Sequence, residues 1–150
     1  MGLDMYLYKK TYVKNWEHMS KTELHEISVK RNGIERTDIK TERISDITEQ
    51  VGYWRKFNAL HKWFVDNCQD GEDKCQESYV SMEKLKELLN VLKEVENAPV
   101  LAGNILPTSQ GFFFGGSNYD EYYYNDVKET ITLLTELLKE EGNYYYQASW

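Results

Sequence analysis

The sequence lacks a long hydrophobic run, and this shortage excludes one large class of protein. No stretch reaches the ~18 consecutive apolar residues that a membrane-spanning helix needs, so we expect neither a transmembrane segment nor membrane binding. The apolar part of MGLDMYLYKK is too short and too polar for a secretory signal. These features predict a cytoplasmic protein.

Positive charge is also in short supply. The chain has 18 Lys and Arg against 25 Asp and Glu, which gives a formal net charge of −7. This balance argues against direct binding of nucleic-acid duplexes through the phosphate backbone. It is compatible with an acidic surface that contacts a basic surface on another protein.

Cysteine is scarce, with Cys68 and Cys75 as the two examples. Two cysteines in a chain without a leader favour free thiols, with a local disulfide as the alternative. The acidic stretch 66–77 around them lacks the spacing of an EF-hand, so a solvated loop is favoured over a calcium site. We therefore expect no metal and no cofactor.

Recognisable catalytic motifs are missing as well. The three histidines form no HExxH or nucleophile motif, and no glycine-rich segment ends in the Gly-Lys-Ser/Thr of a phosphate-binding loop. A weak candidate for acid/base chemistry is His61 paired with Asp4, if the first strand packs near His61. Without such a contact the sequence favours a protein that is not an enzyme.

What is present is a clear order of strands and helices. Alternation at Leu3, Met5 and Leu7 predicts a strand with one apolar face, and Asn32-Gly33 predicts a tight hairpin turn. Residues 75–80 and 143–150 read as further strands, and 112–114 as an apolar strand-like centre. The order predicts a single α+β domain over residues 1–150, with an antiparallel or mixed sheet covered by about three helices.

Three segments have helical periodicity. The first covers residues 44–68, with Ser45 or Asp46 as its cap, and the second follows Ser81. The third begins at about residue 120, where acidic residues crowd its start, and Gly142 follows its end. Apolar residues at helical spacing mark the core faces of the second and third helices.

The acid-free stretch VGYWRKFNALHKWF, residues 51–64, is the most unusual part of the first helix. At about 100° per residue its core stripe contains four apolar or aromatic residues: Tyr53, Phe57, Leu60 and Phe64. An adjoining stripe combines an aromatic ring, an amide, an imidazole and two cations, which belong to Trp54, Arg55, Asn58, His61 and Lys62.

This second stripe has two interpretations. Its side chains are suited to a planar anionic ligand, because Trp offers a stacking face, Arg and Lys neutralise charge, and Asn and His form directional hydrogen bonds. The alternative is an ordinary amphipathic helix with a boundary Trp and a structural His. Whether the stripe faces a cleft decides between them.

The glycine- and tyrosine-rich segments supply secondary candidates. Gly115 and Gly116 can present backbone N–H groups to an anion, or they can simply form a turn between two elements. Tyr122 and Tyr123 belong to a late cluster of aromatic residues too large to be entirely core. Exposed tyrosines are typical of interfaces, so these two residues are also ligand or interface candidates.

The combination of MGLDMYLYKKTYV, VGYWRKFNALHKWF and LPTSQGFFFGGSNYDEYYYNDV resembles a family of small, uncharacterised bacteriophage and prophage proteins. The resemblance covers nearly the whole chain and transfers no active site. It implies a virus-encoded accessory protein of the host cytosol. Small accessory proteins of that kind often counter host defences.

Three functions therefore stand as hypotheses. The first is a non-enzymatic counter-defence inhibitor, which blocks a CRISPR-type effector or another host defence protein, or sequesters a small anionic nucleotide-like ligand. The second is an enzyme acting on a nucleotide or phosphorylated substrate with His61 as acid/base. The third is a structural or interaction module, for which a homodimer is one expected state.

Overall fold

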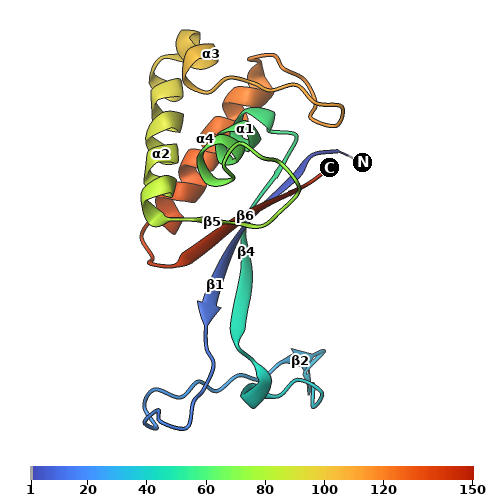
Figure 1. Ribbon diagram of the computed structural model, residues 1–150, viewed down its shortest axis with the longest axis vertical. Coiled ribbons are helices and arrows are strands. Elements are labelled where there is room, and N and C mark those ends of the chain that lie inside the picture. The colour runs from blue at the N-terminus through green and yellow to red at the C-terminus, as the bar shows by residue number, and fades with distance from the viewer. Residues whose placement is uncertain (1) are drawn as a thin grey trace. The chain divides into compact units, whose positions relative to one another are not determined.

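The computed structural model describes residues 2–150 (Figure 1). Its strands are β1 (Asp4–Tyr12), β2 (Lys30–Arg31), β3 (Ile34–Glu35), β4 (Asp46–Arg55), β5 (Ser78–Val80) and β6 (Asn143–Ser149). Its α-helices are α1 (Asn58–Cys68), α2 (Met82–Asn97), α3 (Ala102–Ile105) and α4 (Glu121–Leu137). The chain divides into two compact units, unit 1 (Met1–Lys9 and Gln50–Trp150) and unit 2 (Lys10–Glu49), described separately below.

Unit 1 is built on an antiparallel sheet in the strand order β4-β1-β6-β5, with the helices packed on it. Pairing of β5 with β6 places Ser78 opposite Tyr146 and Val80 opposite Tyr144. Alternation along each strand turns one side toward the core, where Met5 and Leu7 of β1 and Leu3 just before it are fully buried. The predicted α+β fold is confirmed.

Helices α2 and α4 each begin after a residue whose side chain caps the N-terminus of the helix. The Ser81 hydroxyl accepts a hydrogen bond from the Lys84 backbone N–H at 3.2 Å, and the Asp120 carboxylate accepts one from Tyr123 N–H at 3.1 Å. Apolar residues spaced along the inner face of each helix are buried: Leu85, Leu88, Leu92 and Val95 on α2, Val127 and Leu134 on α4. The helix predicted after Ser81 is confirmed.

In unit 2, β2 and β3 form the hairpin that the sequence predicts. Lys30 pairs with Glu35 and Arg31 with Ile34. Asn32 and Gly33 connect the strands with φ angles of +51° and +78°. Both central residues of a type I′ turn need positive φ, which explains the Asn-Gly pair.

The long helix predicted over residues 44–68 is wrong in its first half. Asp46–Arg55 is strand β4, and the helix begins at Asn58. A Cβ at Gly52 would lie 2.8 Å from the Trp54 ring and 3.2 Å from Leu7, so glycine allows close packing here. Hydrogen bonding beside β1 outweighs the helical periodicity of this segment.

The segment Phe112–Phe114 has irregular backbone. Phe112–Phe114, predicted as strand-like, forms a turn in which Phe114 N–H donates to the Gly111 carbonyl at 3.1 Å. That prediction is wrong because the surrounding glycines favour turn geometry over a strand.

Within residues 2–150, no helix has the length and apolar character to cross a membrane.

Candidate functional site

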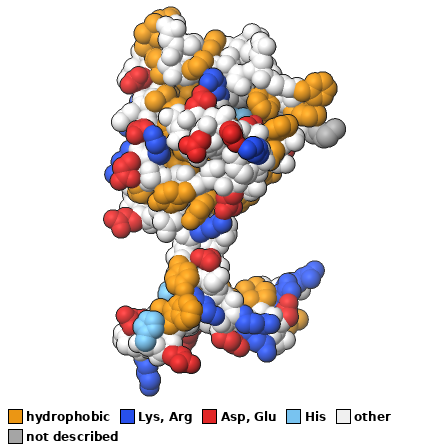
Figure 2. Space-filling view, in the orientation of Figure 1, with side chains coloured by type: hydrophobic (Ala, Val, Ile, Leu, Met, Phe, Trp, Pro, Cys, Tyr) orange, Lys and Arg blue, Asp and Glu red, His pale blue; other side chains and the backbone are white. Residues whose placement is uncertain are grey.

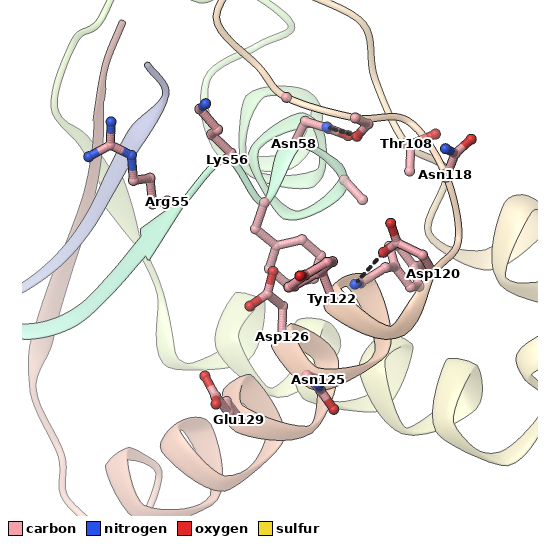
Figure 3. Close-up of a pocket in the computed structure, with 15 residues that line it drawn as sticks. Arg55, Lys56, Asn58, Thr108, Asn118, Asp120, Tyr122, Asn125, Asp126 and Glu129 are labelled. Carbon is pink, nitrogen blue, oxygen red and sulfur yellow. Dashed lines mark hydrogen bonds between the residues drawn. The ribbon is translucent and has the colours of Figure 1, made fainter. Parts of the chain in front are cut away.

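Unit 1 contains a cavity of about 500 Å³ where three separate segments of the chain meet. One wall comes from the end of β4 and the start of α1, residues 55–59. The loop between α3 and α4 provides a second wall, and the first turns of α4 provide the third. Figure 3 shows the polar side chains that these segments contribute.

Asn58 joins two of these walls. Its Nδ2 group donates to the carbonyls of Phe114 at 3.0 Å and Gly116 at 2.8 Å, while its Oδ1 accepts from Ser109 N–H at 2.9 Å. The side chain is buried, so it acts as an internal support that holds the loop against the start of α1. Asn58 therefore shapes the cavity, and its amide is already occupied by protein groups.

The backbone beside Asn58 has an unusual conformation. Lys56 has φ +59° and Gly115 has φ +80°, both in the left-handed region. A Cβ at Gly115 would lie 3.1 Å from the Lys56 Cβ, so these residues approach closely where β4 gives way to α1. Phe57 occupies the cap position of α1 and forms no side-chain cap hydrogen bond.

The charges of the cavity are separated between its walls. Arg55 and Lys56 lie at one edge, with their charged ends directed away from the carboxylates of Asp126 and Glu129 on α4 (Figure 3). Asp120, at the start of α4, adds a third carboxylate. The cavity therefore has a cationic edge and an acidic wall.

Within the acidic wall, the pKa of Asp126 is raised to about 6. Burial is the largest cause, and repulsion from the Glu129 and Asp120 carboxylates adds to it. Asp120 accepts the Tyr123 N–H at the start of α4, and the carboxylates of Asp126 and Glu129 lie on the same wall. Perturbed carboxylates in a cavity are typical of functional sites, because a ligand can supply the missing positive charge or hydrogen-bond donors.

A pH-dependent stability follows from Asp126. Since its folded pKa lies above the unfolded value, its stabilising contribution is complete below about pH 4 and is lost as pH rises through about 6. Screening at this partly exposed carboxylate limits the effect to about 1 kcal/mol. Asp126→Asn should therefore unfold at higher urea than the parent at about pH 7.5, with the advantage shrinking toward about pH 4.5. An equal advantage at both pH values, or the same behaviour in the exposed control Glu141→Gln, would contradict this.

Trp54 and His61 do not lie on an accessible wall, which corrects the predicted stripe. Trp54 is on β4, where its indole N–H donates to the Thr130 hydroxyl at 2.9 Å inside the core. His61 is 1% exposed and does not line the cavity. Their burial follows from the strand-to-helix change at residue 56, which turns both side chains toward partners distant in sequence.

His61 is the centre of a buried network. Its Nε2 lies 2.7 Å from the Asp73 carboxylate, whose same oxygen also accepts from the Trp150 indole at 3.0 Å. Nε2 is therefore a donor, and in the neutral ring this tautomer leaves Nδ1 to accept from the Tyr146 hydroxyl at 2.6 Å. Burial, followed by the Asp73 charge, raises the pKa of Tyr146 well above its ordinary value, which keeps that hydroxyl protonated.

The proposed acid/base pair of His61 with Asp4 is wrong. The Asp4 carboxylate accepts from the Tyr53 hydroxyl at 2.6 Å and lies 3.9 Å from the Arg55 guanidinium. Lys62 is likewise separate from the main cavity. It pairs with Asp66 one helical turn away and lines a smaller cavity of about 170 Å³.

The remaining candidates do come together. Arg55, Gly115, Gly116, Tyr122 and Tyr123 all line the main cavity with Asn58. The Tyr122 ring is 81% exposed, whereas Tyr123 is buried and its hydroxyl donates to the Leu106 carbonyl at 2.8 Å.

Sequence reasoning missed the acidic wall formed by Asp120, Asp126 and Glu129. Acids at a helix start are ordinarily explained by capping, although the i, i+3 spacing of Asp126 and Glu129 was a signal of a shared face.

Neither cysteine lines the cavity. Cys68 and Cys75 are free thiols, as predicted, and burial raises the pKa of Cys68 to about 11, so its reactive thiolate is disfavoured. Among the described residues, no group of three or more His, Cys, Asp or Glu side chains is arranged to hold a metal ion.

Comparison with protein-family models, with curated proteins and with solved structures finds no match to this chain.

Proposed function

We propose that this protein is a non-enzymatic binding protein that sequesters a small nucleotide-like ligand in the cavity of unit 1. The separation of its charges carries the proposal: Arg55 and Lys56 line one edge of the cavity, and carboxylates line the wall on α4. The volume of about 500 Å³ is typical of small-molecule sites. A ligand with an anionic group at one end and hydrogen-bond donors at the other complements both walls.

A nucleotide has this distribution of groups. Its phosphate suits the edge formed by Arg55 and Lys56, where positive charge stabilises an anion. Its ribose hydroxyls and exocyclic amino groups donate hydrogen bonds, which the carboxylates of Asp120 and Asp126 accept. The exposed ring of Tyr122 offers a surface on which a base can stack. Donors beside Asp126 also offset the burial and the repulsion that raise its pKa.

Sequestration needs a binding site but does not need His61 as a catalytic group. Both ring nitrogens of His61 are held by Tyr146 and Asp73, away from the cavity lining, so the enzyme hypothesis lacks its acid/base residue. Together with the resemblance to phage accessory proteins, this supports a virus-encoded counter-defence protein that removes a nucleotide signal in the host cytosol.

The test is a thermal-shift screen of mono- and cyclic dinucleotides, with adenosine and inorganic phosphate as partial ligands. A ligand at 100 times its Kd stabilises the folded state by about 2.7 kcal/mol, which raises Tm measurably. Nucleotides should exceed either partial ligand, and chromatography should recover them chemically unchanged. If no nucleotide shifts Tm, the proposal fails; if the ligand is converted, the enzyme hypothesis replaces it.

Removing the Lys56 charge from the cationic edge should weaken binding of the best nucleotide. We expect Lys56→Ala to raise Kd at least tenfold by calorimetry, since it loses about 1.4 kcal/mol of charge-assisted interaction. Lys93→Ala, which removes an exposed lysine on α2 outside the cavity, is the matched control and should leave Kd unchanged. Equal Kd values for both variants would place the ligand elsewhere.

A second candidate function is direct inhibition of a host defence effector. Residues 10–49 contain eight Lys and Arg and eight Asp and Glu, so the whole net charge of −7 lies in unit 1. An acidic unit complements the basic nucleic-acid channel of a CRISPR-type effector. Salt-sensitive loss of DNA binding by a purified effector, in the absence of any nucleotide ligand, would favour this function over sequestration.

A further inference from the structure

Unit 2 is a folded segment with almost no core of its own. Throughout Lys10–Glu49, which the structure describes completely, Val13 is the single buried residue. Segments of this length bury too little surface for independent stability unless another surface covers them. The absence of a core here therefore requires an explanation.

Polar links hold unit 2 together in place of a core. Asn15 and His25 exchange two hydrogen bonds of 2.8 Å, from the Asn15 amide to the His25 carbonyl and from the His25 N–H to Asn15 Oδ1. The Arg36 guanidinium donates bidentate hydrogen bonds to the Asp38 carboxylate at 3.0 and 2.6 Å. The Thr41 hydroxyl donates to the Ile27 carbonyl at 2.8 Å. Directed contacts of this kind organise a surface while leaving its apolar side chains uncovered.

Those uncovered side chains are numerous. Six large hydrophobic residues of unit 2 are exposed: Tyr12, Trp16, Leu24, Val29, Ile34 and Ile47. Ile34 is 73% exposed and lies beside the turn of the β2–β3 hairpin. Since the sheet contains these two strands alone, each has an outer edge unpaired within residues 2–150. An isolated two-stranded hairpin is marginal in water, so burial of Ile34 by another surface would stabilise it.

The charge distribution indicates what that surface is. Unit 2 has equal numbers of basic and acidic residues, eight of each, whereas unit 1 has a net charge of −7. Figure 2 shows both signs of charge interspersed with hydrophobic side chains in the lower part of the view. Two copies of unit 2 can therefore approach without net repulsion, while two copies of unit 1 repel each other.

We propose that unit 2 is a self-association surface, which pairs with unit 2 of a second copy of this chain and buries Ile34 at the contact. Pairing of identical surfaces about a two-fold axis is the commonest form of oligomer. It covers the exposed apolar side chains with a partner of the same polarity and balanced charge. This pairing does not depend on ligand binding in the cavity of unit 1.

Sedimentation equilibrium of the full chain over a concentration series tests the pairing. The parent should show a monomer–dimer equilibrium, and Ile34→Asp should raise its dissociation constant at least tenfold by placing a charge in the contact. Val100→Asp is the matched control, because Val100 is 94% exposed but belongs to unit 1, and its dissociation constant should equal that of the parent.

Three results would overturn the proposal. The first is a monomer at every concentration up to the solubility limit. The second is dimerisation that Ile34→Asp leaves unchanged, and the third is equal weakening by Val100→Asp. Circular dichroism melting of both variants confirms folding, because the core of unit 1 contains neither position. Nucleotide binding by a monomeric Ile34→Asp variant would separate this proposal from the function proposed for the cavity.

Discussion

Replacing His61 with alanine is expected to lower the free energy of unfolding by about 3–5 kcal/mol, the range for removing a large buried ring. The imidazole fills core space and hydrogen-bonds two partners at once, the buried Tyr146 hydroxyl and the partly buried Asp73 carboxylate. Without it, the Tyr146 hydroxyl at 2.6 Å loses its acceptor and the Asp73 carboxylate loses a donor at 2.7 Å. Unpaired buried polar groups retain their full desolvation cost, so the lost hydrogen bonds add to the cavity left behind.

The measurement is urea unfolding together with thermal melting, where the loss corresponds to a Tm lower by about 10 °C. His18→Ala is the matched control, since His18 is exposed and its loss should change stability by less than about 0.5 kcal/mol. Tyr146→Phe removes one hydroxyl and should cost about 1–3 kcal/mol. A His61→Ala variant as stable as the His18→Ala control would show that the network is not structural.

Replacing Asn58 with alanine should cost about 2–4 kcal/mol and also disable the cavity. Its amide forms three hydrogen bonds with the loop, to the carbonyls of Phe114 and Gly116 and from the N–H of Ser109. Each lost buried bond costs on the order of 1 kcal/mol, more where a partner stays unsatisfied. Because the loop forms one cavity wall, its release should also weaken nucleotide binding.

Comparison with Asn118→Ala distinguishes a residue that holds the loop in place from a residue that only lines the cavity. Asn118 lines the same cavity but is exposed, so its replacement should leave stability within about 0.5 kcal/mol of the parent. Denaturant unfolding gives the stability of each variant, and calorimetry with the best nucleotide gives its affinity. If Asn58→Ala unfolds at the same urea concentration as Asn118→Ala, the three hydrogen bonds do not hold the loop.

Elements with strong local signals were predictable from the sequence. The β2–β3 turn follows from the need for positive φ at Asn32 and Gly33, and the start of α2 follows from the Ser81 cap. Residues 46–55 were not predictable in the same way, because their apolar spacing fits a helix. Residues 46–55 form a strand because they pair with β1 in the sheet. Gly52 was the local sequence feature that indicated close packing.

The candidate site shows the same division. Arg55, Asn58, Gly115 and Gly116 were identified from side-chain and backbone chemistry, and the tertiary structure brings them together around one cavity. Asp126 was missed, because the sequence does not show that α4 turns this carboxylate toward residues from β4 and α1. Its raised pKa arises from that burial and from neighbouring acids, both of which depend on the fold.

The sequence by itself determined the order of most strands and helices, the acidic balance of the chain and the chemical groups available for binding. These properties depend on composition and on contacts between near neighbours along the chain. The tertiary structure alone decided which of residues 51–64 are core residues and which line the cavity. Trp54 and His61 became core residues because Thr130, Tyr146 and Asp73 offer them buried hydrogen bonds, while Arg55 and Asn58 came to line the cavity. Those partners lie 12 to 85 residues away in sequence, and folding brings them into contact.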